Sequence, residues 1–128
     1  PPLQPVIHGD DPQKGRFGGL STRNGRSLKA TVEKSGSVPE FYNVTIWVES
    51  DDPIKNPLNS DVIFYIHDSF SPSVYRITPA EFKDGKAVDD EILSYGAFTV
   101  GAIADNGATM LELDLSEDSR FPKKFRER

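Results

Sequence analysis

The chain of 128 residues carries a net charge of −5 and contains no cysteine, and its length is sufficient for one domain with a contiguous core. Without cysteine there is no disulfide framework, thiolate zinc site or thiol nucleophile, and an acidic chain lacks the basic face that sequence-independent nucleic-acid binding needs. No apolar run approaches the roughly 20 residues that span a bilayer, so we expect a cytoplasmic domain with no membrane partner. We also expect no cofactor.

The two ends of the chain are poor in apolar residues. Residues 1–16 contain three prolines among the first five positions, and we predict a flexible linker there. The domain itself is expected to run from Phe17 to Ser116. Residues 117–128 are predicted to form a polar, basic tail, since five cations lie there: Arg120, Lys123, Lys124, Arg126 and Arg128.

Between these ends, apolar and polar residues alternate in short stretches, which is typical of half-buried strands. We predict strands at residues 27–33, 42–49, 61–66, 74–78, 98–104 and 110–115. Residues 87–93 are ambiguous between strand and loop, and tight turns are indicated at Asn24-Gly25, Asp84-Gly85 and Asn106-Gly107. The predicted fold is therefore all-β, an immunoglobulin-like antiparallel sandwich of about seven to eight strands.

Signatures of enzymes are missing from the sequence. No Gly-x-Ser-x-Gly elbow, phosphate loop, dinucleotide glycine fingerprint or His-Glu-x-x-His motif occurs. With only two histidines, one of them in the N-terminal segment, we expect no metal site and no catalytic triad. The acidic clusters at 10–11, 51–52 and 89–91 lack the spaced ligands of a calcium loop and indicate solvated turns, although a calcium-stabilised adhesion-like domain remains an alternative.

Two short motifs could form a binding site. His67-Asp68-Ser69-Phe70 follows the most apolar predicted strand, and Tyr95-Gly96-Ala97-Phe98 precedes another. Each motif also has an ordinary structural interpretation, in which Ser69 caps a turn, Phe70 fills the core and Gly96 makes a turn. If both loops open at one end of the sandwich, Phe70 and Tyr95 face each other across a slot.

In this order, and with strands on either side, the motifs resemble the YEATS domain, an immunoglobulin-like sandwich that in eukaryotes reads acylated lysines on histone tails. The resemblance covers approximately Leu58 to Ser116 and includes Pro72 and Arg76. Residues 16–21, Arg-Phe-Gly-Gly-Leu-Ser, and residues 96–102, Gly-Ala-Phe-Thr-Val-Gly-Ala, are similar to the prokaryotic branch of the family.

The resemblance implies that an acyl-lysine threads between the rings of Phe70 and Tyr95, whose faces sandwich the flat acyl amide. Ser69 would hydrogen-bond this amide through its hydroxyl, and His67 would orient Ser69 or line the floor. The acyl carbonyl oxygen would meet backbone groups of Tyr95, Gly96 and Ala97. For a third aromatic ring of the eukaryotic pattern the candidates are Phe17, Phe41 and Trp47.

The predicted function is a non-enzymatic module that binds an acylated-lysine protein or peptide, or a similar planar modified group. By resemblance it would be the sensor of a larger prokaryotic signalling or defence protein, and monomeric as an isolated domain. The alternative is a generic interaction module that uses a sheet edge or another surface and has no acyl-lysine pocket.

Overall fold

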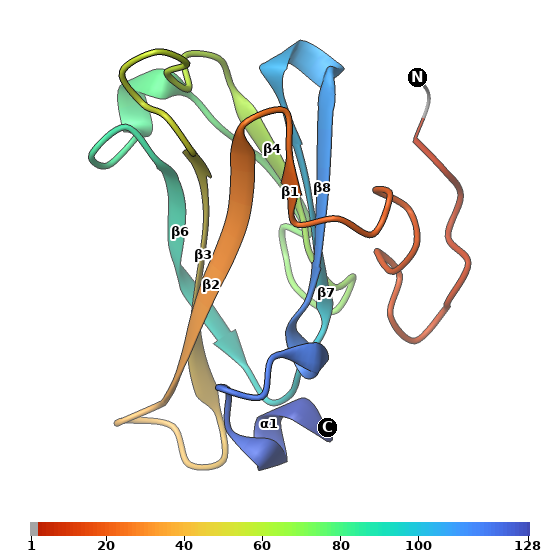
Figure 1. Ribbon diagram of the computed structural model, residues 1–128. Coiled ribbons are helices and arrows are strands. Elements are labelled where there is room, and N and C mark those ends of the chain that lie inside the picture. Colours follow the sequence, from red (N-terminus) through yellow and green to blue (C-terminus); the bar gives the residue numbers. More distant parts are fainter. Residues whose placement is uncertain (1–2) are drawn as a thin grey trace.

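A computed structural model describes residues 3–128 as two antiparallel sheets of four strands that face each other (Figure 1). The first sheet has the order β1-β2-β3-β6, with β1 (Thr22–Arg23), β2 (Arg26–Lys34), β3 (Tyr42–Ser50) and β6 (Ala87–Ser94). The second has the order β5-β4-β7-β8, with β5 (Val74–Ile77), β4 (Val62–Tyr65), β7 (Thr99–Ala104) and β8 (Thr109–Asp114). The predicted all-β sandwich is confirmed.

Helical structure is limited to short turns at the ends of strands. They are the 3₁₀ turns η1 (Pro79–Glu81), η2 (Asp105–Gly107) and η3 (Leu115–Glu117), and the single-turn helix α1 (Lys123–Arg126). None of the helices within residues 3–128 has the length and apolar character needed to cross a membrane.

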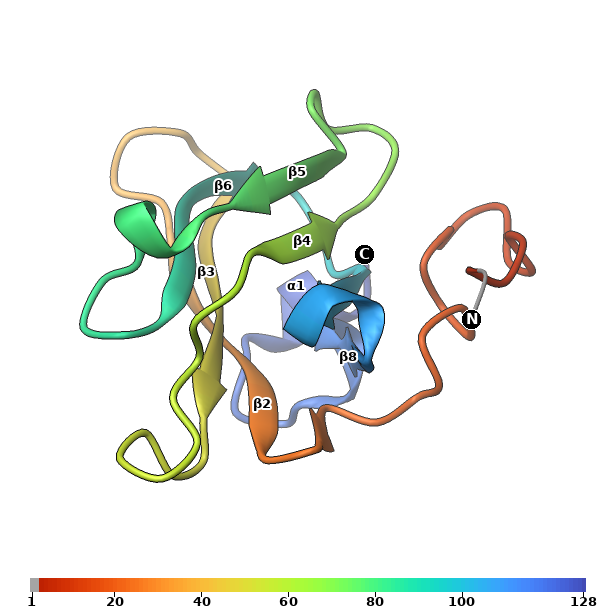
Figure 2. The ribbon, with the colours of Figure 1, turned by 90° about the horizontal axis from the view of Figure 1, so that it is seen from above.

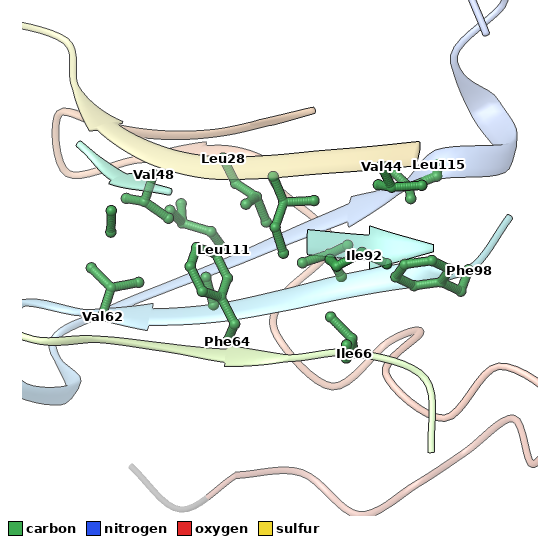
Figure 3. Packing of buried hydrophobic residues seen from close by; sticks show 14 of the residues in the cluster. Leu28, Val44, Val48, Val62, Phe64, Ile66, Ile92, Phe98, Leu111 and Leu115 are labelled. Carbon is green, nitrogen blue, oxygen red and sulfur yellow. The ribbon is translucent and has the colours of Figure 1, made fainter. Parts of the chain in front are cut away.

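The core lies between the sheets and follows from the alternation of side chains along each strand. Figure 3 shows side chains from both sheets meeting in this layer, among them Leu28, Val44, Val62, Phe64 and Leu111. All five are almost completely buried. The sandwich therefore presents rigid strand ends from which the connecting loops emerge.

Residues 87–93, ambiguous in the sequence, belong to β6. The pairing of β6 with β3 shifts in register, since Asp89 lies opposite Ile46 whereas Ile92 lies opposite Val44. This irregularity places the exposed Asp90 and Glu91 together on an edge strand. The shift breaks the alternation on which the sequence-based prediction of a strand depends.

Residues 11–17 form a layer on the second sheet, although the sequence predicted a flexible linker for residues 1–16. The carboxylate of Asp11 accepts hydrogen bonds from the backbone N–H and the hydroxyl of Thr99, at 2.9 and 2.7 Å. The amide of Gln13 donates to the carbonyl of Ile66 at 2.9 Å, and Glu112 accepts from the N–H groups of Gly15 and Phe17. Because the residues that anchor this layer are polar, they leave no hydrophobic periodicity in the sequence from which the layer could be predicted. Pro1 and Pro2, also part of the predicted linker, lie outside the described residues.

Residues 117–128 also differ from the predicted polar tail. Phe121 and Phe125 are buried, and the ring of Phe125 lies 5.3 Å from that of Tyr42. The carbonyl of Phe125 accepts a hydrogen bond from the N–H of Ala97 at 2.9 Å. Helix α1 thus closes the lower end of the sandwich in Figure 1, because Phe125 of the helix and Phe121 just before it both pack in the core.

Candidate functional site

The two predicted loops open at the same end of the sandwich. Strand β4 pairs with β7, with Tyr65 opposite Gly101, so the loop that leaves β4 (residues 66–73) lies beside the loop that enters β7 (residues 95–98). A cleft of about 400 Å³, here called the aromatic cleft, lies between these loops. All six predicted ligand-binding residues line it: His67, Ser69, Phe70, Tyr95, Gly96 and Ala97.

The two predicted rings are each supported by a different aromatic neighbour. Phe70 is half-buried and meets Phe98 edge-on, with the ring centroids 5.2 Å apart. Tyr95 is 51% exposed and meets Phe41 edge-on at 5.7 Å. Edge-on contacts are favourable for aromatic rings and hold Phe70 and Tyr95 in place on the lining of the cleft.

Only one of the three candidates for a third ring reaches the aromatic cleft. Phe41, at the end of the loop before β3, lines it. Phe17 instead lies against Tyr65, at 5.1 Å between centroids, and the indole N–H of Trp47 donates to Glu49 at 2.7 Å. The sequence could not choose among them, because the position of a loop side chain depends on tertiary contacts.

A chain of hydrogen bonds sets the orientation of Ser69. The Nε2 atom of His67 lies 3.0 Å from the carbonyl oxygen of Asp10, and since a carbonyl can only accept, Nε2 carries the proton. In the neutral ring Nδ1 is then an acceptor, and it receives the hydroxyl of Ser69 at 2.8 Å and the N–H of Ser69 at 3.1 Å. The hydroxyl hydrogen of Ser69 therefore points at His67, which leaves the oxygen lone pairs for a donor in the cleft.

The backbone of residues 95–97 offers fewer donors than the resemblance implies. The N–H of Ala97 is already bonded to Phe125, so Ala97 contributes to the lining and not as a donor. The hydroxyl of Ser94 donates to the carbonyl of Gly96 at 2.7 Å. Among residues 3–128, the N–H groups of Tyr95 and Gly96 have no acceptor, and they are the donors of this loop that remain for a ligand.

Arg128 is a residue of the aromatic cleft that the sequence-based reasoning missed. Its guanidinium carbon lies 4.0 Å from the centroid of Tyr95, within the range of a cation–π contact. The same group donates to the carbonyl and the carboxylate of Glu40, both at 2.6 Å, and this hydrogen bond and its charge lower the pKa of Glu40. A basic residue in a polar segment gives no signal of such a contact.

Glycine at position 96 is required for this arrangement. A Cβ atom there would lie 2.6 Å from Cβ of Arg128 and 2.9 Å from its backbone, closer than real contacts allow. Gly96 therefore lets the C-terminal segment approach the loop.

No group of three or more histidine, cysteine, aspartate or glutamate side chains is placed to hold a metal ion in the described part of the chain.

Comparison with protein-family models identifies the family of the chain. The model of pYEATS, the prokaryotic YEATS domain, matches residues 42–116, which is more than half of the chain and extends from β3 to beyond β8. The matched stretch contains both loops of the aromatic cleft. No curated protein and no solved structure matches the chain.

Proposed function

Because the chain belongs to the prokaryotic YEATS domain family, a family of binding modules, we propose that it reads acylated lysine, or a similar planar modified group, in the aromatic cleft. The acyl amide would lie against the rings of Phe70 and Tyr95. Its N–H would donate to Ser69, and its carbonyl would accept from the free N–H groups of residues 95 and 96. The proposal includes no catalytic step.

The observation that carries this proposal is the chain of contacts from the carbonyl of Asp10 through His67 to Ser69. With its hydroxyl hydrogen engaged by Nδ1 of His67, Ser69 presents an acceptor, which suits the single N–H of an acyl-lysine amide. A hydroxyl that turned to donate to a ligand would lose its bond to His67. The bond between His67 and Asp10 fixes the ring tautomer and so prepares the site before a ligand arrives.

Discrimination against unmodified lysine follows from charge. A lysine ammonium is strongly hydrated and carries three donors, and it would lose much of that hydration between two aromatic rings. The guanidinium of Arg128, which already lies over Tyr95, would repel it. Acylation removes the charge and leaves a flat amide with one donor and one acceptor.

The proposal extends to the setting of the module. We propose that it is the sensor attached to an effector in a larger prokaryotic signalling or defence protein of the cytoplasm. Its partner would be a modified protein or peptide. It would bind as a monomer, with residues of one chain lining the aromatic cleft.

Isothermal titration calorimetry with matched peptides tests the proposal. Acetyl-lysine and crotonyl-lysine peptides should bind with dissociation constants below about 1 mM, which corresponds to roughly 4 kcal/mol of binding free energy, and the unmodified peptide should not. Equal binding of modified and unmodified peptides would favour the generic interaction module. No acyl-dependent heat at millimolar peptide would overturn the reader function.

A further inference from the structure

A second cleft, of about 560 Å³, lies between the edge strands β5 and β6. Figure 2 shows these two strands side by side at one edge of the sandwich, each in a different sheet. We call this cleft the edge groove. Phe70 and Leu93 line both the edge groove and the aromatic cleft, so the two adjoin at these residues.

The floor of the edge groove is apolar and fixed. Ile77 and Ile92 line it and are 9% and 6% exposed. The hydroxyl of Tyr75 on β5 donates to Asp89 on β6 and so links the two sheets. Burial and this carboxylate raise the pKa of Tyr75 above its ordinary value. The phenol therefore keeps its proton at neutral pH and continues to donate to Asp89.

The rim of the edge groove carries a surplus of negative charge. Four carboxylates line it, those of Glu81, Asp89, Asp90 and Glu91, against the two cations Arg76 and Lys83. Both cations are already paired, Lys83 with Asp90 at 3.0 Å and Arg76 with Asp61, which does not line the groove, at 2.9 Å. Among residues 3–128, Glu91 has no cationic partner within 4.0 Å and is exposed to solvent.

From this shared boundary and this charge we infer that the edge groove holds the residues next to the modified lysine in a partner peptide, and that those residues include lysine or arginine. The inference rests on the proposed function, because the edge groove adjoins the aromatic cleft. The unpaired carboxylate of Glu91 would meet a cation, and the apolar floor would cover its aliphatic stem.

Recognition in the edge groove would depend on side chains and not on strand addition. The register shift that brings Asp90 and Glu91 together disrupts the free edge of β6, and β5 has only four residues. Irregular and short edge strands oppose pairing with another chain. An extended peptide lying between them can still present alternate side chains to the floor and the rim.

The test uses the full chain and peptides of equal length that share a central crotonyl-lysine. One peptide has lysine and arginine on both sides, one has glutamine and one has glutamate, and crotonyl-lysine capped as an amide on both ends serves as the ligand without flanks. The basic peptide should bind about tenfold more tightly than the glutamine peptide, and the glutamate peptide more weakly than both. Raising salt from roughly 0.05 to 0.5 M should shrink the difference.

Glu91→Lys should reduce the preference for basic over glutamine flanks about threefold to tenfold, as expected for reversing one surface charge, while the capped crotonyl-lysine binds as before. Glu33→Lys is the matched control, because it makes the same change on an exposed position of β2 that does not line the edge groove, and it should leave the preference intact.

The outcomes separate the two proposals. Equal affinity for basic and neutral flanks, or a preference that survives Glu91→Lys, overturns the role of the edge groove while acyl-dependent binding still supports the reader function. Absence of acyl-dependent binding with every peptide overturns both. A preference that falls equally in Glu33→Lys shows a general effect of net charge and also overturns the edge groove.

Discussion

The ring of Phe17 occupies the space that Gly101 leaves on the outer face of β7. A Cβ atom at position 101 would lie 2.2 Å from Cε1 of Phe17, and Phe17 is completely buried. The two residues belong to the two motifs that resemble the prokaryotic branch, at 16–21 and 96–102. The structure thus gives these motifs a common physical basis, in which one supplies a ring and the other supplies the glycine beneath it.

Gly101→Ala should therefore destabilise the fold by about 1–3 kcal/mol, the usual cost of overpacking a filled site. Urea unfolding measures the effect. Gly36→Ala is the matched control, because a Cβ atom at position 36 meets nothing within 4 Å, and it should change stability little. Adding Phe17→Leu to Gly101→Ala should recover part of the loss, since residues in contact do not act additively. Equal stability of the two alanine variants would contradict the contact.

Ser69→Ala should weaken acyl-lysine binding about threefold to tenfold, which corresponds to roughly one hydrogen bond. Ser69 is exposed, so the free energy of unfolding should hardly change. Ser69→Thr keeps the hydroxyl and should retain most of the affinity. Calorimetry with a crotonyl-lysine peptide measures all three proteins, and an equal loss in the threonine and alanine variants would argue against acceptance by the hydroxyl.

Tyr95→Ala should abolish measurable acyl-lysine binding and leave the fold intact. The ring is half exposed, so its removal leaves no cavity in the core. Phe98→Ala provides the contrast, because Phe98 is 3% exposed and its truncation should cost about 3–5 kcal/mol of stability. Thermal unfolding and calorimetry on both variants separate the two roles. Unfolding of Tyr95→Ala at room temperature would show instead that the ring is a structural element.

The sequence predicts what local patterns encode and misses what distant contacts create. Alternation located the strands around Val44 and Leu111, and the placement of two motifs next to paired strands brought Phe70 and Tyr95 to one end of the fold. The layer anchored by Asp11 and the position of Arg128 depend on partners about 30 to 90 positions away in the chain. Such pairs of polar groups leave no periodic signal in a single sequence.

The same limit applies to the hydrogen bonds within the aromatic cleft. The pairing of His67 with Ser69 is local, two positions apart, and the motif suggested it. The carbonyl of Asp10 that fixes the tautomer lies 57 positions away, in a segment whose prolines indicated a linker. The hydrogen bond from the N–H of Ala97 to the carbonyl of Phe125 likewise depends on helix α1. The basic composition of residues 117–128 gave no reason to predict that helix.

Asp105 and Arg26 should make the stability of the fold depend on pH. Arg26 is buried, with 5% of its side chain exposed, and its Nη2 lies 2.9 Å from Oδ1 of Asp105, which is 26% exposed. The hydrogen bond from Arg26 is the main cause that lowers the pKa of Asp105, with Thr109 assisting against the opposing effect of burial. A carboxyl whose pKa is lowered by folding stabilises the folded state above the unfolded value of about 3.9, and this contribution is lost as the pH falls through the lower folded pKa.

Asp105→Asn should consequently destabilise the fold at pH 7 by about 2–4 kcal/mol, because it leaves the buried guanidinium without its counter-charge. Urea unfolding from pH 7 to roughly pH 3 should show a constant difference between wild type and variant down to about pH 5, and a shrinking one below about pH 4. Asp118→Asn is the matched control. Its partner Arg120 also lowers the pKa of the carboxyl but is 81% exposed, so solvent screens the pair and little should change. Equal effects of the two substitutions, or a difference that persists undiminished at pH 3, would show that the charge of Asp105 does not stabilise the fold.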